Sequence, residues 1–368
     1  MQRNLMLITV LSILLILSCS EETTAPELIL PTATAPAEGD GSVFNPYLIE
    51  TLEHLYWLSQ NEDMWDMHYK QVSDIDASAT KKWACGGMEP IGYSYDYAFS
   101  GSFDGDGYVI EDLYIDRARR EHVGLFGFTN GAAISNVRLN GVIVNGYGFV
   151  GGLAGRNTWD SVISNCFVEG EVSGKYSIGG IVGYNIGSAV DSCYAGGNFS
   201  GDDFVGGLVG TNTGSTIDAS SSNANVSGKN GVGGLVGRNV SNSIISNSYS
   251  RGSVIRSTGV ANLNIGSFAG RNVSSAIEYS YSTGSVTYQE AEDPLDKGFV
   301  GDSIDGTFNA NFFDSEASAQ TSGIGAEAKT TAEMQIESTF TDAGWDFDEI
   351  WTIDGVFNDG YPYLLWER

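Results

Sequence analysis

Hydrophobic residues recur at a nearly constant interval along the chain from residue 123 onward. Each repeat opens with a Gly-rich segment that carries a large apolar residue, and successive openings lie 27 or 28 residues apart over the first five copies. A second apolar position follows nine or ten residues later, and a third lies nine residues beyond it. A fixed period of this length predicts a solenoid, in which each turn buries its apolar face against its neighbours. The three apolar columns are Leu125, Leu153, Ile181, Leu208, Leu235 and Phe268; Ile134, Ile163, Val190, Ile217, Ile245 and Ile277; and Ile143, Val172, Phe199, Val226, Val254 and Val286.

The residues between these columns are mainly Gly, Asn and Ser. This pattern predicts three short strands per turn joined by tight corners, and the repeats show no helical spacing of apolar residues. Stacked turns would pair as parallel strands about 4.8 Å apart, and crossovers between parallel strands are almost always right-handed. The predicted fold class is therefore all-β: a right-handed parallel β-helix (β-solenoid) with short helical segments in the N- and C-terminal caps.

One polar column accompanies the apolar ones. An Asn lies two residues after the Gly that closes each opening segment from the second copy onward. Asn tolerates the left-handed backbone of corners, and stacked Asn amides bond to one another along the axis of a stack. We interpret the column as structural rather than as a ligand site. Its members are Asn157, Asn185, Asn212, Asn239 and Asn272.

The unit at residues 232–254 resembles the GLUG motif, which is named for its Gly-Leu-hydrophobic-Gly core. The resemblance extends over residues 123–301, and it weakens where Ser221 replaces an aromatic residue and where Ser267 replaces a Gly. The motif occurs in tandem in large bacterial surface proteins, in adhesin-like proteins and in the non-catalytic parts of some IgA-specific metallopeptidases. The resemblance implies a surface location and a β-helical fold, and it supplies no catalytic residue.

Both ends of the solenoid need caps, because terminal turns expose strand edges. On the N-terminal side, residues 49–61 have the spacing of a short amphipathic helix, and strands are expected at 69–75, 99–103 and 108–115. On the C-terminal side, residues 330–340 predict a short helix with Thr331 as its cap and Glu333 in its first turn.

An aromatic-rich tail follows this C-terminal helix. Aromatic rows in extracellular proteins stack on sugar rings, and they also form ordinary capping cores. We favour the capping core. The aromatic residues of the tail are Trp345, Phe347, Trp351, Phe357, Tyr361, Tyr363 and Trp366.

The first residues of the chain indicate its compartment. An apolar run at residues 5–17 is too short to span a bilayer, and it ends in Ile16, Leu17, Ser18 and Cys19. A small residue followed by Cys resembles a bacterial lipobox, in which the chain is cut before the Cys and the thiol receives diacylglycerol. The alternative is an ordinary signal peptide with an incidental Cys. We interpret Cys19 as a lipidation site, which predicts a lipid-anchored protein of the bacterial outer membrane or cell surface.

The domain organisation follows from these segments. We predict a signal peptide at residues 1–18 and a lipid-anchored, flexible tether at 19–41. An N-terminal cap with the first coils covers 42–122, the GLUG-type solenoid covers 123–301, and an aromatic-rich C-terminal cap covers 302–368.

The net charge restricts the classes of binding partner, and the cysteine content restricts the disulfides that the chain can form. The net charge of −28 argues against nucleic acid as a partner, because nucleic-acid binding needs clustered Lys and Arg. Apart from Cys19, the chain has Cys85, Cys166 and Cys193, an odd set that does not suggest a disulfide framework. Cys166 and Cys193 lie one repeat apart and should be neighbours, either bridged or, as we favour, as two reduced buried thiols.

Three acidic features could in principle bind a cation or a substrate. Residues 104–107 form an Asp-Gly-Asp-Gly segment, which lacks the further ligands of a calcium loop and is typical of a tight turn. Two insertions, at 255–264 and 287–298, should leave the same corner of consecutive coils, and the second is acidic. Asp191 and Asp218 share one register without a basic partner, which indicates a solvated pair.

Catalytic motifs are absent from the sequence. The histidines His54, His68 and His122 form no HExxH motif, and no GxSxG elbow or phosphate loop is present. We therefore predict no enzymatic activity, no cofactor and no metal site. The predicted function is that of an adhesin-like or scaffold binding module, which binds a glycan or an extracellular protein and is held to the membrane by its lipid anchor. The alternative is a polysaccharide lyase or hydrolase on a β-helix, which would need convergent carboxylates with Lys or Arg along one sheet.

Overall fold

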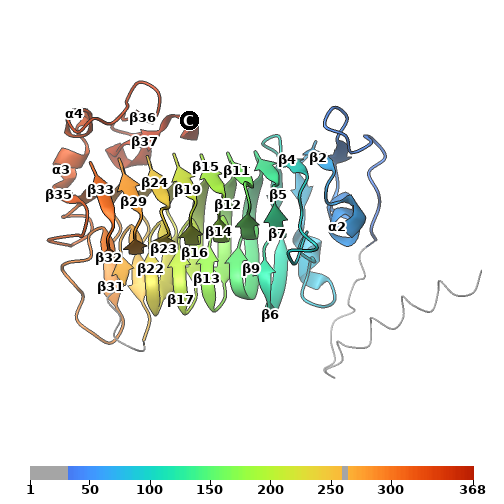
Figure 1. Ribbon diagram of the computed structural model, residues 1–368, viewed down its shortest axis with the longest axis horizontal. Helices are drawn as coiled ribbons and strands as arrows, with labels where there is room; N and C mark the ends of the chain where they lie inside the picture. Colours follow the sequence, from blue (N-terminus) through green and yellow to red (C-terminus); the bar gives the residue numbers. More distant parts are fainter. Residues whose placement is uncertain (1–31, 259–263) are drawn as a thin grey trace, which may run out of the picture.

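The computed structural model describes residues 32–258 and 264–368. Within these residues the body of the chain is a β-solenoid whose turns stack from the N-terminal helix to the C-terminal helices (Figure 1). The strands of successive turns pair in parallel, and among the described strands only β36 (Trp351–Thr352) and β37 (Tyr363–Leu364) pair antiparallel. The prediction of an all-β parallel solenoid with short helices in its caps is confirmed.

Two of the faces of the solenoid are regular sheets with one strand from each turn. One has 10 strands and the other has 7 strands. The larger consists of β1 (Tyr47–Ile49), β2 (His68–Gln71), β4 (Ser102–Asp104), β8 (Ala133–Ser135), β11 (Val162–Ser164), β15 (Ala189–Asp191), β19 (Thr216–Asp218), β24 (Ile244–Ser246), β29 (Ala276–Glu278) and β33 (Thr307–Asn309). The smaller consists of β7 (Phe126–Asn130), β10 (Ala154–Thr158), β14 (Val182–Ile186), β18 (Val209–Thr213), β23 (Val236–Val240), β28 (Ala269–Val273) and β32 (Val300–Ile304).

The remaining strands of the solenoid form a third, less regular set that also pairs turn upon turn. It begins with β3 (Ile75–Asp76), β5 (Val109–Glu111), β6 (Tyr114–Val123), β9 (Arg138–Gly151), β12 (Phe167–Ser173), β13 (Tyr176–Gly179), β16 (Tyr194–Ser200), β17 (Asp203–Gly206) and β20 (Ser221–Ser222). It continues with β21 (Asn225–Gly228), β22 (Asn230–Gly233), β25 (Tyr249–Ser250), β26 (Val254–Arg256), β27 (Ile265–Gly266), β30 (Tyr281–Ser282), β31 (Val286–Tyr288), β34 (Phe312–Asp314) and β35 (Glu327–Lys329).

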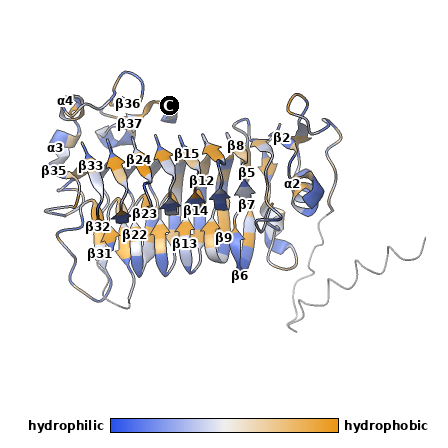
Figure 2. Cartoon of the chain, in the orientation of Figure 1, coloured by the Kyte–Doolittle hydropathy of each residue, from blue (hydrophilic) through white to orange (hydrophobic). Residues whose placement is uncertain are grey.

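The apolar columns of the sequence form the core of the solenoid. Hydrophobic positions recur at the same level in successive strands (Figure 2), and the side chains of the columns are buried. One assignment is wrong. Val172 pairs with Val144 and not with Ile143, because the register of β12 against β9 shifts between Val168 and Gly170. Val144 is therefore the buried member of the column, and Ile143 is only half-buried.

The Asn column is a continuous ladder of buried amides. The Nδ2 atom of each Asn donates to the Oδ1 atom of the next at 2.9 Å, from Asn157 through to Asn272. None of these residues has the left-handed backbone that Asn tolerates at corners. The column is structural, as predicted, because stacked amides satisfy one another inside the core.

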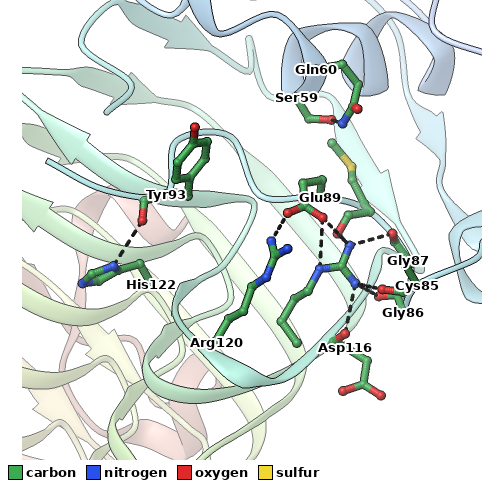
Figure 3. Close-up of polar contacts among 12 residues, drawn as sticks. Ser59, Gln60, Cys85, Gly86, Gly87, Glu89, Tyr93, Asp116, Arg120 and His122 are labelled. Carbon is green, nitrogen blue, oxygen red and sulfur yellow. Dashed lines mark hydrogen bonds and ion pairs between the residues drawn. The ribbon is translucent and has the colours of Figure 1, made fainter. Parts of the chain in front are cut away.

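The N-terminal cap is held to the solenoid by a buried arginine. Helix α2 (Leu52–Gln60) begins after its cap Thr51 and covers the first turn. Behind it, the guanidinium of Arg117 donates to the carbonyl oxygens of Gly86, Gly87 and Met88 and to Glu89, which also binds Arg120 (Figure 3). A loop with so many carbonyls facing inward needs such a donor, because buried carbonyls without partners are costly.

The C-terminal helix differs from its prediction. It is split into α3 (Thr331–Met334) and α4 (Glu337–Thr341). Its cap is Thr330 rather than Thr331: the Thr330 hydroxyl accepts from the Glu333 backbone, and the Glu333 carboxylate accepts from the Thr330 backbone. This reciprocal pairing is a capping box, which decides the first residue of the helix. Beyond α4 the chain folds back along the side of the solenoid (Figure 1).

Candidate functional site

A row of outward-facing side chains follows the third set of strands from turn to turn. Neighbouring members of the row are paired in register across β9, β12, β16, β20, β25, β30 and β34. Most of them are aromatic, so we call the row the aromatic ladder. Its members are Arg138, Phe167, Tyr194, Ser221, Tyr249, Tyr281 and Phe312.

The C-terminal tail covers one half of this ladder. Tyr249 and Tyr281 stack at 5.0 Å, and the tail packs Trp351 and Trp345 against them to form a second hydrophobic core. Most aromatic residues of the tail thus form a packed core, but the predicted position of this core as a cap on the end of the solenoid is wrong. This core lies along the flank of the solenoid rather than on its end.

The tail ends where the ladder is interrupted by a small residue. Ser221 donates to the carboxylate of Glu367 at 2.7 Å, and the Trp366 indole donates to the Ala219 carbonyl at 2.8 Å. Glu367 also accepts from the hydroxyl of Tyr249 at 2.8 Å. The position of Ser221 therefore leaves the room that the last residues of the chain occupy.

The other half of the ladder is uncovered. The rings of Phe167 and Tyr194 stack with 4.3 Å between their centroids, and both remain half-buried. The guanidinium of Arg138 lies 5.1 Å from the centre of the Phe167 ring. Because the two rings stack on each other and Arg138 lies over Phe167, the stack presents ring edges and the Tyr194 hydroxyl beside a cation. Such a mixed apolar and polar wall suits the CH groups and the hydroxyls of a sugar.

A groove of about 1000 Å³ lies between these rings and the loop of the tail. The uncovered rings form one side of this groove, and the tail loop at residues 354–359 forms the other with the exposed side chains of Val356 and Phe357. We call it the lateral groove. Its volume is in the upper part of the range for ligand pockets.

Acidic and basic groups line the same groove. The carboxylates of Glu111 and Glu169 are joined there by those of the tail, and Arg138 and Arg251 provide positive charge. Arg251 is occupied by the tail, since it donates to Asp359 at 2.7 Å and to Asn358.

Glu169 is an acidic group of the groove that is hydrogen-bonded to Tyr194, one of the two uncovered rings. A Cβ atom on Gly196 would collide with the Glu169 carboxylate and crowd the Tyr194 hydroxyl, so the absence of a side chain at Gly196 makes room for this pair. Burial raises the pKa of Glu169, and its hydrogen bond with Tyr194 acts in the opposite direction. The groove can therefore offer a carboxyl group next to a ring surface.

The other sequence candidates lie elsewhere and are structural where the structure describes them. Asp191 and Asp218 are stacked neighbours, as predicted. Asp218 accepts from Ser246 at 2.7 Å and from Asn247 at 2.9 Å. Burial and the neighbouring Asp218 charge raise the pKa of Asp191, while a hydrogen bond from Ser192 lowers it. Neither carboxylate of this pair lines the lateral groove.

The structure also decides three further interpretations. Cys166 and Cys193 are buried and unbridged, as favoured from the sequence. Asp104 accepts from the Asp106 backbone at 2.9 Å, and Gly107 has a φ of +80°, so the Asp-Gly-Asp-Gly segment is a tight turn. The two insertions leave the same corner, since Arg256 is paired with Tyr288.

The lipidation site predicted at Cys19 lies outside the described residues. Within residues 32–258 and 264–368, no group of three or more His, Cys, Asp or Glu side chains is arranged to hold a metal ion. The same part of the chain contains no helix that is long and apolar enough to cross a membrane.

Sequence reasoning missed the lateral groove. The aromatic column is visible in the sequence as a Phe or Tyr that recurs in most repeats, but recurrence alone marks it only as a property of the motif. The available signal was this column together with an aromatic-rich tail, a combination which implies that part of the row is covered. How many rings stay uncovered depends on where the tail docks, and the sequence does not show that.

Comparison with known proteins supports the repeat assignment. The GLUG motif matches residues 146–173 and 228–255. Halomucin of Haloquadratum walsbyi is 39% identical over 155 residues, which is 41% of this chain and 2% of that protein. A protein of Evansella cellulosilytica, whose name describes a Gly-rich membrane protein, is 34% identical over 406 residues, covering 89% of this chain and 45% of the relative. The chain thus spans less than half the length of either curated relative.

A solved structure has the same architecture. A protein from Bacteroides ovatus whose crystal structure was described as that of an immunoglobulin A1 protease aligns with a TM-score of 0.61 and 20% identity, over 90% of this chain and 96% of that one. At this level of identity the likeness shows the β-helical fold alone.

Proposed function

Because the chain is a GLUG-repeat protein with a parallel β-solenoid body, we propose that it is a cell-surface binding module that holds a glycan in its lateral groove. The observation that carries the proposal is the uncovered pair of stacked rings, Phe167 and Tyr194, beside the cation of Arg138. Apolar ring edges that stay partly exposed on a rigid sheet suit a ligand that brings its own CH groups, and sugars do so.

A surface location is part of the same proposal. The relative from Evansella cellulosilytica is named as a membrane protein, and the start of this chain resembles a lipoprotein signal with Cys19 as the lipidated residue. The anchor would place the solenoid outside the cell as an adhesin-like module or scaffold. Protease treatment of intact cells tests the location, and incorporation of labelled fatty acid into the wild type but not into Cys19→Ala tests the anchor.

The glycan proposal is tested with the full chain on an array of neutral and acidic oligosaccharides. The variant Phe167→Ala/Tyr194→Ala should bind the best neutral ligand about tenfold more weakly or worse, since each ring contact contributes about 0.5–1.5 kcal/mol. Trp159→Ala is the matched control, because Trp159 is an aromatic residue with 60% exposure that does not line the groove. Equal binding by the double variant and the control would contradict the proposal.

A second candidate function is cleavage of the bound glycan. The observation that favours it is that the groove carries Glu111 and Glu169, with the pKa of Glu169 raised by burial, beside the basic Arg138. A hydrolase needs one protonated and one ionised carboxyl group. We propose binding without catalysis, without a cofactor and without a nucleic-acid partner. Release of reducing sugar by the wild type, lost in Glu169→Gln, would replace this proposal by the enzymatic one.

A further inference from the structure

The smaller sheet carries a second aromatic surface, away from the lateral groove. At one corner of five successive turns a residue adopts left-handed backbone, with φ between +51° and +63°, and these residues stack as His122, Phe149, Ser177, Phe204 and Gly231. Beside them runs a column of outward-facing residues on the sheet, paired in register. This second column is Phe128, Arg156, Tyr184, Thr211, Arg238, Arg271 and Asp302.

The two columns together leave a pit. Ser177 lies between Phe149 and Phe204 in the corner column, and Thr211 lies between Tyr184 and Arg238 in the sheet column. In both columns the middle residue is small and its neighbours are large. The resulting cavity has a volume of about 510 Å³.

The floor of the pit is polar. The hydroxyls of Ser177 and Thr211 lie 2.9 Å apart and are buried, so each can donate to or accept from the other. Both residues line the pit, and their mutual contact uses only one donor and one acceptor position of the two hydroxyls. This arrangement suits a ligand that carries hydroxyl groups.

The walls of the pit are aromatic, and two of the wall residues, Phe149 and Phe204, adopt a backbone conformation that bulky residues avoid. Phe149 stacks on Tyr184 at 5.3 Å on one side, and Phe204 lies against Arg238 on the other. Left-handed backbone is unfavourable for bulky residues and natural for Gly, which the chain uses at Gly231 in the same column. The left-handed corner also occurs at His122, outside the pit, so it is a feature of the repeat rather than of the pit alone.

The pit has a cation, Arg238, that forms no ion pair with any described residue. Arg238 lies 5.2 Å from the centre of the Phe204 ring, and its buried Nε atom has no hydrogen-bond partner among the described residues. Asp203 also lines the pit, and its carboxylate accepts from Asn230 at 3.1 Å. One coil further on, the equivalent Arg271 is neutralised by Asp302 at 3.0 Å. Arg238 is thus held in place by a ring and remains available for an anion.

We propose that this pit binds a single acidic sugar residue, with its carboxylate on Arg238 and its ring between the aromatic walls. Arg matches a carboxylate with two parallel hydrogen bonds, and the hydroxyl floor matches the polar groups of a sugar. The net charge of −28 repels polyanions at long range, which favours one short-range carboxylate contact over a densely charged polymer. The site is independent of the lateral groove and of its ligand.

The test compares two probes that differ only at one carbon: an oligosaccharide that ends in glucuronic acid, and its carboxyl-reduced counterpart that ends in glucose. Calorimetry with the full chain should show that the acidic probe binds more tightly, and that Arg238→Gln weakens it about tenfold to a hundredfold. The variant Arg238→Lys should lose less affinity for the acidic probe, because it keeps the positive charge and loses only the second hydrogen bond. Equal affinity for the two probes, or an unchanged Arg238→Gln variant, would overturn the proposal.

Two further variants distinguish binding in the pit from binding elsewhere on the chain. Thr211→Tyr continues the ring stack from Tyr184 into the pit and should abolish binding while Arg238 is retained. Arg271→Gln, in the same column but outside the pit, should bind like the wild type. The groove variant Phe167→Ala/Tyr194→Ala should also bind the acidic probe normally, and loss of binding there would assign the probe to the lateral groove and contradict the pit.

Discussion

The two halves of the aromatic ladder have the same register and the same kind of side chain, but they differ in burial. Tyr281 is fully buried under the tail, whereas Tyr194 is half-exposed in the lateral groove. The ladder residues are paired in register in both halves, although β12 and β16 are seven residues long and β25 and β30 only two. The difference therefore comes from a segment that is far away in the sequence. A repeat protein can thus use one row of residues both for stability and for recognition, depending on which part of the row is covered.

The largest effect is expected at the centre of the covered half. Tyr281→Ala removes a ring that packs against Trp345, Trp351 and Tyr361. It should lower the free energy of unfolding by about 3–5 kcal/mol, as large-to-small changes of buried aromatic residues do. Denaturant unfolding followed by tryptophan fluorescence measures this. A loss as small as that of Tyr194→Ala would contradict the division of the ladder into two halves.

A smaller effect is expected at the boundary between the halves. Ser221→Tyr would continue the ladder into the space of Trp366 and Glu367, which bind Ala219 and Ser221. We expect a loss of about 1–3 kcal/mol from overpacking, and faster proteolysis of the tail because its end is displaced. The control Asn223→Ser alters an exposed residue that also lines the groove and should leave the tail protected.

The stability of the covered half of the ladder should also depend on pH. Burial raises the pKa of Glu367 above its ordinary value of 4.5, and hydrogen bonds from Ser221, Leu364 and Tyr249 oppose this shift. The folded state then takes up a proton at a pH where the unfolded state has released it, so stability rises as the pH falls through the raised pKa and levels off below the ordinary value. This gain should be absent in Glu367→Gln. Parallel pH profiles for the two proteins would contradict it.

The smallest effect on stability is expected in the uncovered half. Tyr194→Ala removes one partner of an exposed cross-strand pair and should cost less than about 1 kcal/mol. It should nevertheless reduce glycan binding by the lateral groove, whereas Ser221→Tyr, which displaces the tail, should change both stability and binding. Thermal unfolding measures the effect on stability, and the oligosaccharide array measures the effect on binding. A large stability loss in Tyr194→Ala would mean that its ring is part of the core.

Much of the solenoid was predictable because its information is local and repeated. The Leu125 column, the Asn157 ladder and the stacking of Cys166 on Cys193 each follow from a constant period, since residues one period apart must meet in a stack. The exception is Ile143, where the extra residue of a bulge moved the core position to Val144. A bulge of this kind depends on how two strands pair, so the count of residues alone does not reveal it.

By itself, the sequence determined the period, the apolar columns and hence the parallel stack, because a 27-residue repeat with three apolar positions can bury them in few other ways. Only the tertiary structure decided which outward-facing residues stay uncovered by other parts of the chain. The tail docks over Tyr249 and Tyr281 and stops at Ser221, and the pit exists because Ser177 and Thr211 meet across two strands. The docking of the tail depends on contacts between segments whose separation along the chain has no fixed period, so no pattern in the sequence encodes it. The two small residues of the pit stand at repeating positions of the sequence, but only the fold shows that these two columns lie side by side at a corner.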